Sequence, residues 1–231
     1  MIFEQLFDQK SSTYTYIIAS GEGREALIID PVIEHSDEYS TILKNLDLKL
    51  VKVIDTHIHA DHISALNELN KRTNCIRVMG EKSKSEVIDL RIKDGEKINV
   101  EEVELQAIYT PGHTDCSYSF LMNDRVFTGD TLLINGSGRT DFQNGNAYDA
   151  YDSIFNKLLK LPEKTLVFPA HDYNGKKFST IENEKNNNPR LQVSSKEEYA
   201  DIMNNLNLAN PKMMDVAVPA NVKGLTLDNI N

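Results

Sequence analysis

Five of the six histidines in this 231-residue chain occur where a predicted strand gives way to a loop. They are His57, His59, His62, His113 and His171. Asp61 shares the segment DTHIHADH (55–62) with three of them, and Asp130 ends the segment RVFTGD in the same way. Imidazole and carboxylate groups gathered in this way are typical of a metal site with nitrogen and oxygen ligands. A metal centre is therefore the expected chemistry, and His35, the sixth histidine, is expected to be an ordinary surface residue.

The hydrophobic pattern predicts the elements that must position these residues. Strands are expected at 13–20, 24–30, 48–56, 76–79, 103–109 and 164–172, with a hairpin-like pair at 116–130. Helices are expected at 36–46, 61–71, 147–161, 178–187 and 195–206. His57 and His59 would point the same way from an extended segment, and Asp61 and His62 would enter from the first turn of the next helix. Because strand ends gather functional groups in α/β folds, these side chains are expected to lie close together.

Composition argues against several other classes of function. The formal net charge is −10 with no dense Lys/Arg cluster, which argues against a nucleic-acid partner. No apolar run reaches the roughly 18 residues that span a bilayer, and MIFEQLFDQK has no features of a signal or transit peptide. A cytoplasmic bacterial protein without a membrane segment is expected. Cys75 and Cys116 cannot make a disulfide framework and are expected to be buried thiols. Without repeats or linkers, residues 1–231 are expected to form one domain with a short helical and extended tail from about 176.

Four motifs occur in an order that resembles the metallo-β-lactamase fold superfamily. They are THIHADH (56–62), PGHT (111–114), TGDTLL (128–133) and AHD (170–172). The resemblance implies an α/β (α+β) fold, a four-layer αββα sandwich with the metal site at one edge between two sheets. Within that superfamily, further segments resemble the persulfide dioxygenases, also called sulfur dioxygenases. These segments are GSGRTDFQNG (136–145), FPAHDYNG (168–175), STIENEKNNNPRL (179–191) and VAVPAN (216–221).

The resemblance to persulfide dioxygenases implies one Fe(II) per chain, held by His57, His113 and Asp130. Two histidines and one carboxylate leave coordination positions open for oxygen chemistry. The implied reaction oxidises glutathione persulfide with O₂ and water to sulfite and glutathione, with no catalytic residue beyond the iron centre. Arg139 and Tyr173 match family positions that contact the glutathione moiety, and a homodimer is expected. The remaining motif residues would orient ligands and waters around the iron; they are His59, Asp61, His62 and His171.

Hydrolases of the same superfamily use these residues to hold two metal ions. There His57, His59 and His113 would bind one ion, Asp130 would bridge, and the other ion would take Asp61, His62 and His171. Spacing alone does not choose between one ion and two, because both arrangements use the same seven residues. The alternative function is accordingly a glyoxalase II type hydrolase of glutathione thioesters. The segments GRTDFQ and PAHDYNG argue against this alternative, because they resemble the persulfide dioxygenases. An alternative of another class is a catalytically silent persulfide-binding sensor, which would have no reason to keep the complete ligand set.

Overall fold

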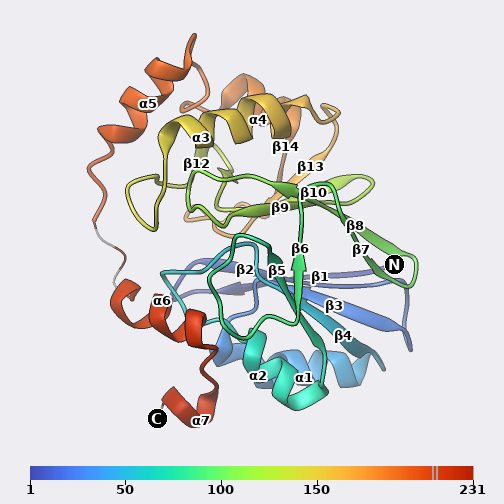
Figure 1. Ribbon diagram of the computed structural model, residues 1–231. Coiled ribbons are helices and arrows are strands. Elements are labelled where there is room, and N and C mark those ends of the chain that lie inside the picture. Colours follow the sequence, from blue (N-terminus) through green and yellow to red (C-terminus); the bar gives the residue numbers. More distant parts are fainter. Residues whose placement is uncertain (210, 212, 231) are drawn as a thin grey trace.

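Two sheets lie face to face between two layers of helices in the computed structural model, which describes residues 1–209, 211 and 213–230 (Figure 1). This order of layers is the αββα sandwich expected from the sequence. None of the helices in the described ranges is long and apolar enough to cross a membrane.

The first sheet has six strands in sequence order. They are β1 (Ile2–Asp8), β2 (Thr13–Ala19), β3 (Glu25–Ile29), β4 (Lys49–Ile54), β5 (Ile76–Gly80) and β6 (Leu90–Ile92). The first three strands pair antiparallel, and β3 to β6 pair parallel. The carboxyl ends of β3 and β4 therefore lie at the same edge, and the metal-site segment 55–62 begins there.

The second sheet also has six strands, but their order in space differs from their order in the chain. It runs β14 (Ser179–Thr180), β13 (Leu166–Pro169), β10 (Arg125–Gly129), β9 (Tyr118–Leu121), β8 (Val103–Tyr109) and β7 (Lys97–Val100). β10 and β13 are parallel neighbours, so Asp130 and His171 follow strand ends at one edge. A short separate hairpin, β11 (Leu132–Leu133) and β12 (Gly136–Ser137), follows Asp130 directly.

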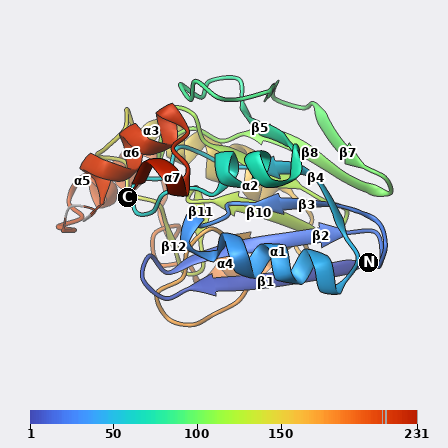
Figure 2. The same ribbon diagram turned by 90° about the horizontal axis from the view of Figure 1, so that it is seen from below.

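Helices cover the outer faces of the two sheets (Figures 1 and 2). α1 (Ser36–Asn45), α2 (Leu66–Thr73) and α6 (Met214–Lys223) share a hydrophobic cluster with the first sheet. α3 (Ala147–Tyr151), α4 (Ile181–Asn187) and α5 (Lys196–Asn204) share one with the second sheet. α3 continues through a π-helical stretch (Asp152–Lys157) into a 3-10 turn (Leu158–Lys160), which together cover the helix expected at 147–161. A 3-10 turn (Ile33–His35) precedes α1, and α7 (Leu227–Ile230) follows α6.

Aromatic side chains fill the space between the sheets. Tyr16 of β2 lies 4.9 Å from Phe127 of β10 and 5.7 Å from Phe168 of β13, measured between ring centroids. Each such pair adds about 0.5–1.5 kcal/mol to the stabilisation from burial alone. The Tyr16 hydroxyl donates a hydrogen bond to the carbonyl oxygen of Pro169, and the backbone N–H of Tyr14 donates to the carbonyl oxygen of Ala170. The two sheets are thus held together beside the strand ends that carry the metal-site residues.

The prediction that a helix begins at Asp61 is wrong. Residues 61–65 are irregular, and α2 begins at Leu66. Ser64 instead forms an isolated antiparallel bridge with Val32, and the Ser64 backbone N–H donates to the side-chain oxygen of Asn221. These tertiary contacts satisfy the backbone where a helix was expected, so Asp61 and His62 reach the site from a loop.

Candidate metal centre

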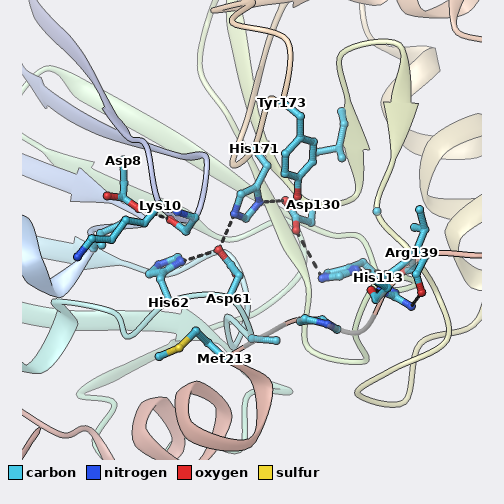
Figure 3. Close-up of a pocket in the computed structure, with 18 of the residues that line it drawn as sticks. Asp8, Lys10, Asp61, His62, His113, Asp130, Arg139, His171, Tyr173 and Met213 are labelled. Carbon is cyan, nitrogen blue, oxygen red and sulfur yellow. Dashed lines mark hydrogen bonds and ion pairs between the residues drawn. The ribbon is translucent and has the colours of Figure 1, made fainter.

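All seven predicted metal-site residues meet at one edge of the sandwich. Figure 3 shows the five that line the cavity there: Asp61, His62, His113, Asp130 and His171. The loop after β4 contributes four of them, the loop after β8 one, and the ends of β10 and β13 one each. In chain order they are His57, His59, Asp61, His62, His113, Asp130 and His171. The predicted convergence of strand ends is therefore present in the structure.

His57, His113 and Asp130 form one group whose ligand atoms all lie within 4.8 Å of one another. His113 Nε2 lies 3.6 Å from Asp130 Oδ2. The Nδ1 atom of His113 is 2.7 Å from the carbonyl oxygen of Arg139, and because that oxygen can only accept, Nδ1 carries the ring hydrogen. With the ring hydrogen on Nδ1, Nε2 is the nitrogen that can bind a metal, on the side of Asp130.

The orientation of the His57 ring depends on Asp30 at the end of β3. Asp30 accepts hydrogen bonds from the backbone N–H of Thr56 at 2.7 Å and from the Thr56 hydroxyl at 3.0 Å. Since that hydroxyl donates to Asp30, its oxygen accepts from Nδ1 of His57, 2.9 Å away, and Nε2 is again the lone-pair nitrogen. Burial, with the nearby rings of His59 and His113, holds the pKa of His57 well below its usual range, so the ring is neutral.

His59, Asp61 and His62 form a second group whose ligand atoms lie within 4.8 Å of one another. One ring nitrogen of each histidine bonds to a carboxylate: His59 Nε2 to Asp30 at 3.1 Å and His62 Nδ1 to Asp61 at 3.0 Å. The other two nitrogens, His59 Nδ1 and His62 Nε2, are buried without a hydrogen-bond partner in the described part of the chain. Buried polar atoms rarely stay unpaired, so this donor set fits a cation or an ordered water.

His171 lies between the two carboxylates of the site. Its Nδ1 is 2.6 Å from Asp130 Oδ1 and its Nε2 is 2.8 Å from Asp61 Oδ2. Burial lowers the pKa of His171, but Asp130 and Asp61 raise it well above its usual range. The resulting imidazolium holds Oδ1 of Asp130 and leaves Oδ2 on the side of His113.

A cavity of about 820 Å³ opens onto both groups. Arg139 and Tyr173, the predicted substrate contacts, both line it (Figure 3). The Arg139 guanidinium donates two 2.7 Å hydrogen bonds to the Asp141 carboxylate and one of 2.6 Å to the Ala209 carbonyl oxygen. Its Nε and both of its terminal nitrogens therefore already have partners within the protein. Tyr173 is 71% exposed, and its ring is stacked on His171 with centroids 6.2 Å apart.

Two cations in the cavity wall were missed by the sequence prediction. Arg190 lies between α4 and α5 and donates to the carbonyl oxygen of Ser137, and Lys10 follows β1. Neither has a carboxylate partner among the described residues. Arg190 belongs to the segment NPRL, so the only signal in the sequence was a motif without an assigned role.

The two cysteines are buried as predicted, and neither lies among the residues that line the cavity. Burial raises the pKa of both thiols, which keeps them protonated and unreactive.

Comparison with known proteins gives the relationships of the chain. Residues 9–89 and 80–171 match the metallo-beta-lactamase superfamily. The chain is 43% identical over 226 residues to the mitochondrial persulfide dioxygenase ETHE1 of Mus musculus, an alignment that covers 96% of this chain and 88% of that protein. The crystal structure of ETHE1 from Myxococcus xanthus has a TM-score of 0.94 at 49% identity, covering 96% of this chain and 98% of that one. The hydroxyacylglutathione hydrolase of Dictyostelium discoideum is more distant, at 29% identity over 75% of this chain and 68% of that protein.

Proposed function

Because the chain belongs to the metallo-beta-lactamase superfamily and, within it, to the persulfide dioxygenases, we propose that it oxidises glutathione persulfide with O₂ and water to sulfite and glutathione. The enzyme class follows from the family, and so does the use of a metal and of a sulfur substrate. Glutathione as the carrier, a single Fe(II) per chain, and a homodimer in a bacterial cytoplasm belong to the proposal.

The observation that supports the proposal most is the group His57, His113 and Asp130. Each histidine keeps Nε2 available for a metal, and His113 and Asp130 line a cavity of about 820 Å³. When bound, a ferrous ion supplies O₂ activation, as it does in other sites with two histidines and one carboxylate. The protein itself orients the ligands through Thr56, His171 and the Arg139 carbonyl oxygen.

The cavity wall fits an anionic thiol such as glutathione. Arg190 and Lys10 offer positive charge to its carboxylates, and Tyr173 lies beside His171, close to where the reacting sulfur would bind. A direct contact between Arg139 and the substrate stays a prediction. Because its guanidinium group donates two hydrogen bonds to Asp141, Arg139 can also act by fixing the conformation of the cavity wall.

The dinuclear hydrolase is a second candidate because one observation favours it. The unpaired nitrogens of His59 and His62 could take a second metal ion. Against that arrangement, both ring nitrogens of His171 bond to carboxylates, which suits a residue that holds Asp130 in place.

One experiment separates these functions. The protein is purified anaerobically, its metals are counted, and oxygen uptake with glutathione persulfide is compared with hydrolysis of a glutathione thioester. One iron per chain with persulfide-dependent uptake supports the dioxygenase, whereas two metals with thioester hydrolysis would refute it. Metal or persulfide binding without turnover would instead favour the sensor.

A matched pair of variants tests the ligand set. His113→Ala should lose the iron, and His62→Ala should keep one iron per chain. Loss of metal from both variants to the same extent would contradict the mononuclear site.

A further inference from the structure

His35, the histidine outside the metal-site cluster, is connected to that cluster by hydrogen bonds. It ends the 3-10 turn before α1, and its side chain is 32% exposed. Nε2 lies 3.0 Å from Asp8 Oδ1, and Nδ1 lies 2.9 Å from Glu38 Oε2. Asp8 is at the end of β1 and lines the same cavity as His62 and His171 (Figure 3).

From Asp8 the connection continues inward through two hydroxyl groups. Asp8 Oδ2 accepts from the Ser11 hydroxyl at 2.6 Å, and Ser11 Oγ lies 2.7 Å from Thr13 Oγ1. Thr13 is completely buried, and its oxygen lies 3.0 Å from Nε2 of His171 and 3.3 Å from Nδ1 of His62. An unbroken row of hydrogen-bonding groups thus joins the metal centre to a partly exposed imidazole. We name it the relay: Thr13, Ser11, Asp8 and His35.

The hydrogen bonds of the relay can all point outward. Asp8 can only accept, so Ser11 donates to it. Ser11 then accepts from Thr13 when the Thr13 hydroxyl hydrogen turns to it from Asp61 Oδ2, its other acceptor at 3.2 Å. Thr13 then accepts from a ring N–H of His171 or His62, each of which it shares with Asp61 Oδ2. In this orientation a proton enters at Thr13, each hydroxyl passes on its own hydrogen, and a proton reaches the Asp8–His35 pair without movement of any heavy atom.

Persulfide oxidation releases protons that must leave the site. One persulfide, one O₂ and one water give one thiol, one sulfite dianion and two protons. The sulfur–sulfur bond breaks, the terminal sulfur gives its electrons to O₂, and the departing thiol keeps one of the three hydrogens. A substrate that fills the cavity displaces the water that could otherwise carry these protons, whereas the relay runs within the wall.

We propose that the relay carries protons released at the metal centre to His35 and from there to solvent. This inference rests on the proposed persulfide dioxygenase activity. The charged groups that face His35 are Asp8 of β1 and Glu38 of α1, and the ring of Tyr39 lies 6.3 Å away. Burial lowers the pKa of His35, but the two carboxylates outweigh it and raise the pKa above its usual value. His35 can thus receive a proton near neutral pH and release it at its exposed side.

The test compares iron-loaded wild type with His35→Gln and Ser11→Ala, using Ser40→Ala on α1 as a matched control. Oxygen uptake with glutathione persulfide is measured in dilute buffer, with and without added imidazole. Both relay variants should lose roughly tenfold in kcat, at unchanged iron content, because proton transfer becomes limiting. Imidazole should restore His35→Gln, since it can accept the proton from Asp8, and should not restore Ser11→Ala.

Wild-type kcat in either relay variant would overturn the relay, and so would a slow His35→Gln that imidazole does not restore. A wild type that consumes no oxygen would refute the proposed function itself. A second measurement needs no turnover: in the metal-free protein, Asp8→Asn should lower the pKa of His35 in a titration followed by NMR. An unchanged pKa would show that the outer step of the relay does not form.

Discussion

The two histidines proposed as ligands each donate a hydrogen bond from Nδ1 to another group of the protein. The two acceptors lie in unrelated parts of the chain. His57 donates to the hydroxyl of its neighbour Thr56, and His113 to the carbonyl oxygen of Arg139. That both histidines belong to a cluster suited to a metal could be predicted, because their residue types and their positions after strands are visible in the sequence. The groups that orient them could not, because Asp30 and a backbone carbonyl of residue 139 carry no local pattern.

Thr56→Val tests whether the hydroxyl orients His57. Valine keeps the shape of the side chain but leaves Nδ1 of His57 and Oδ2 of Asp30 unpaired. We expect Fe(II) affinity to fall about 10–100-fold, as after other losses of a group that orients a metal ligand. Competition with a chelator under anaerobic conditions measures this, with Thr41→Val on the exposed face of α1 as the control. Equal affinity in wild type and both variants would exclude a role for the hydroxyl.

Arg190→Gln tests the proposed contact with an anionic substrate group. Loss of a charge-assisted hydrogen bond costs about 1.5–3 kcal/mol, so KM for glutathione persulfide should rise at least roughly tenfold while kcat changes little. Arg24→Gln is the matched control, because Arg24 pairs with Glu101 and Glu102 and is not among the cavity-lining residues. If the two variants have the same KM, Arg190 does not bind the substrate.

At the scale of elements, regular amphipathic segments were predicted well and context-dependent ones were not. The expected strand at 103–109 and helix at 36–46 correspond to β8 and α1 within one residue. β1 was missed because IFEQLFD has no strict alternation, and it forms by pairing along its whole length with β2. α6 was missed because Pro219 lies inside it. Tertiary contacts decide both elements, and they are not visible in a local window.

Gly138→Ala tests how closely the hairpin β11–β12 and the residues after it must approach the ligands. A Cβ at this position would lie 2.1 Å from the carbonyl oxygen of Asp130 and 2.9 Å from Nδ1 of His113. Relief of this overlap moves His113 away from the Arg139 carbonyl oxygen, so we expect weaker metal binding and a loss of about 1–3 kcal/mol in unfolding free energy. Chelator competition and chemical denaturation measure the two effects.

Gly21→Ala is the control for that variant, because its nearest neighbour would be a flexible arginine carbon 3.8 Å away. If Gly138→Ala bound metal as tightly as this control, the close packing would not matter for the site.

The contact between the end of β1 and the turn before α1 should make stability depend on pH. Burial lowers the pKa of His35, but Asp8 and Glu38 outweigh it and raise the pKa above the unfolded value of about 6.5. The stabilisation of the folded state by protonated His35 is therefore fully present below about pH 6.5, and it disappears as pH rises through the pKa of the folded state. Hydrogen bonds from Ser11 and His35 outweigh burial and lower the pKa of Asp8, so its carboxylate stays ionised at weakly acidic pH.

The difference in unfolding free energy between wild type and His35→Gln should therefore be largest near about pH 5.5, by about 0.5–1 kcal/mol for a partly exposed pair. It should shrink towards about pH 9, because both proteins then lack the charge. Denaturation curves across this range measure it. A difference that grows with pH would reverse the sign and contradict the assigned pair.

On the scale of the whole molecule, the metal centre joins both sheets and the C-terminal region. The motif VAVPAN (216–221) was recognised from the sequence without a reason for its last residue. The structure supplies one: the Asn221 amide group donates to the carbonyl oxygens of His59 at 2.9 Å and His62 at 3.0 Å. Its oxygen accepts from the backbone N–H of Ser64 at 2.8 Å. One side chain of α6 thus holds the loop that carries four site residues, across more than 150 positions of sequence.

Asn221→Ala should consequently affect the site although Asn221 touches no ligand atom. Three backbone groups of the loop lose their partner, which we expect to cost about 2 kcal/mol in unfolding free energy and about tenfold in metal affinity. Asn187→Ala, which removes an exposed asparagine of α4, should change neither quantity. Thermal denaturation with and without Fe(II) measures both, because bound metal stabilises the folded state in proportion to its affinity. If Asn221→Ala lost stability but gained as much from Fe(II) as wild type, α6 would be a structural support and the loop would hold its ligands unaided.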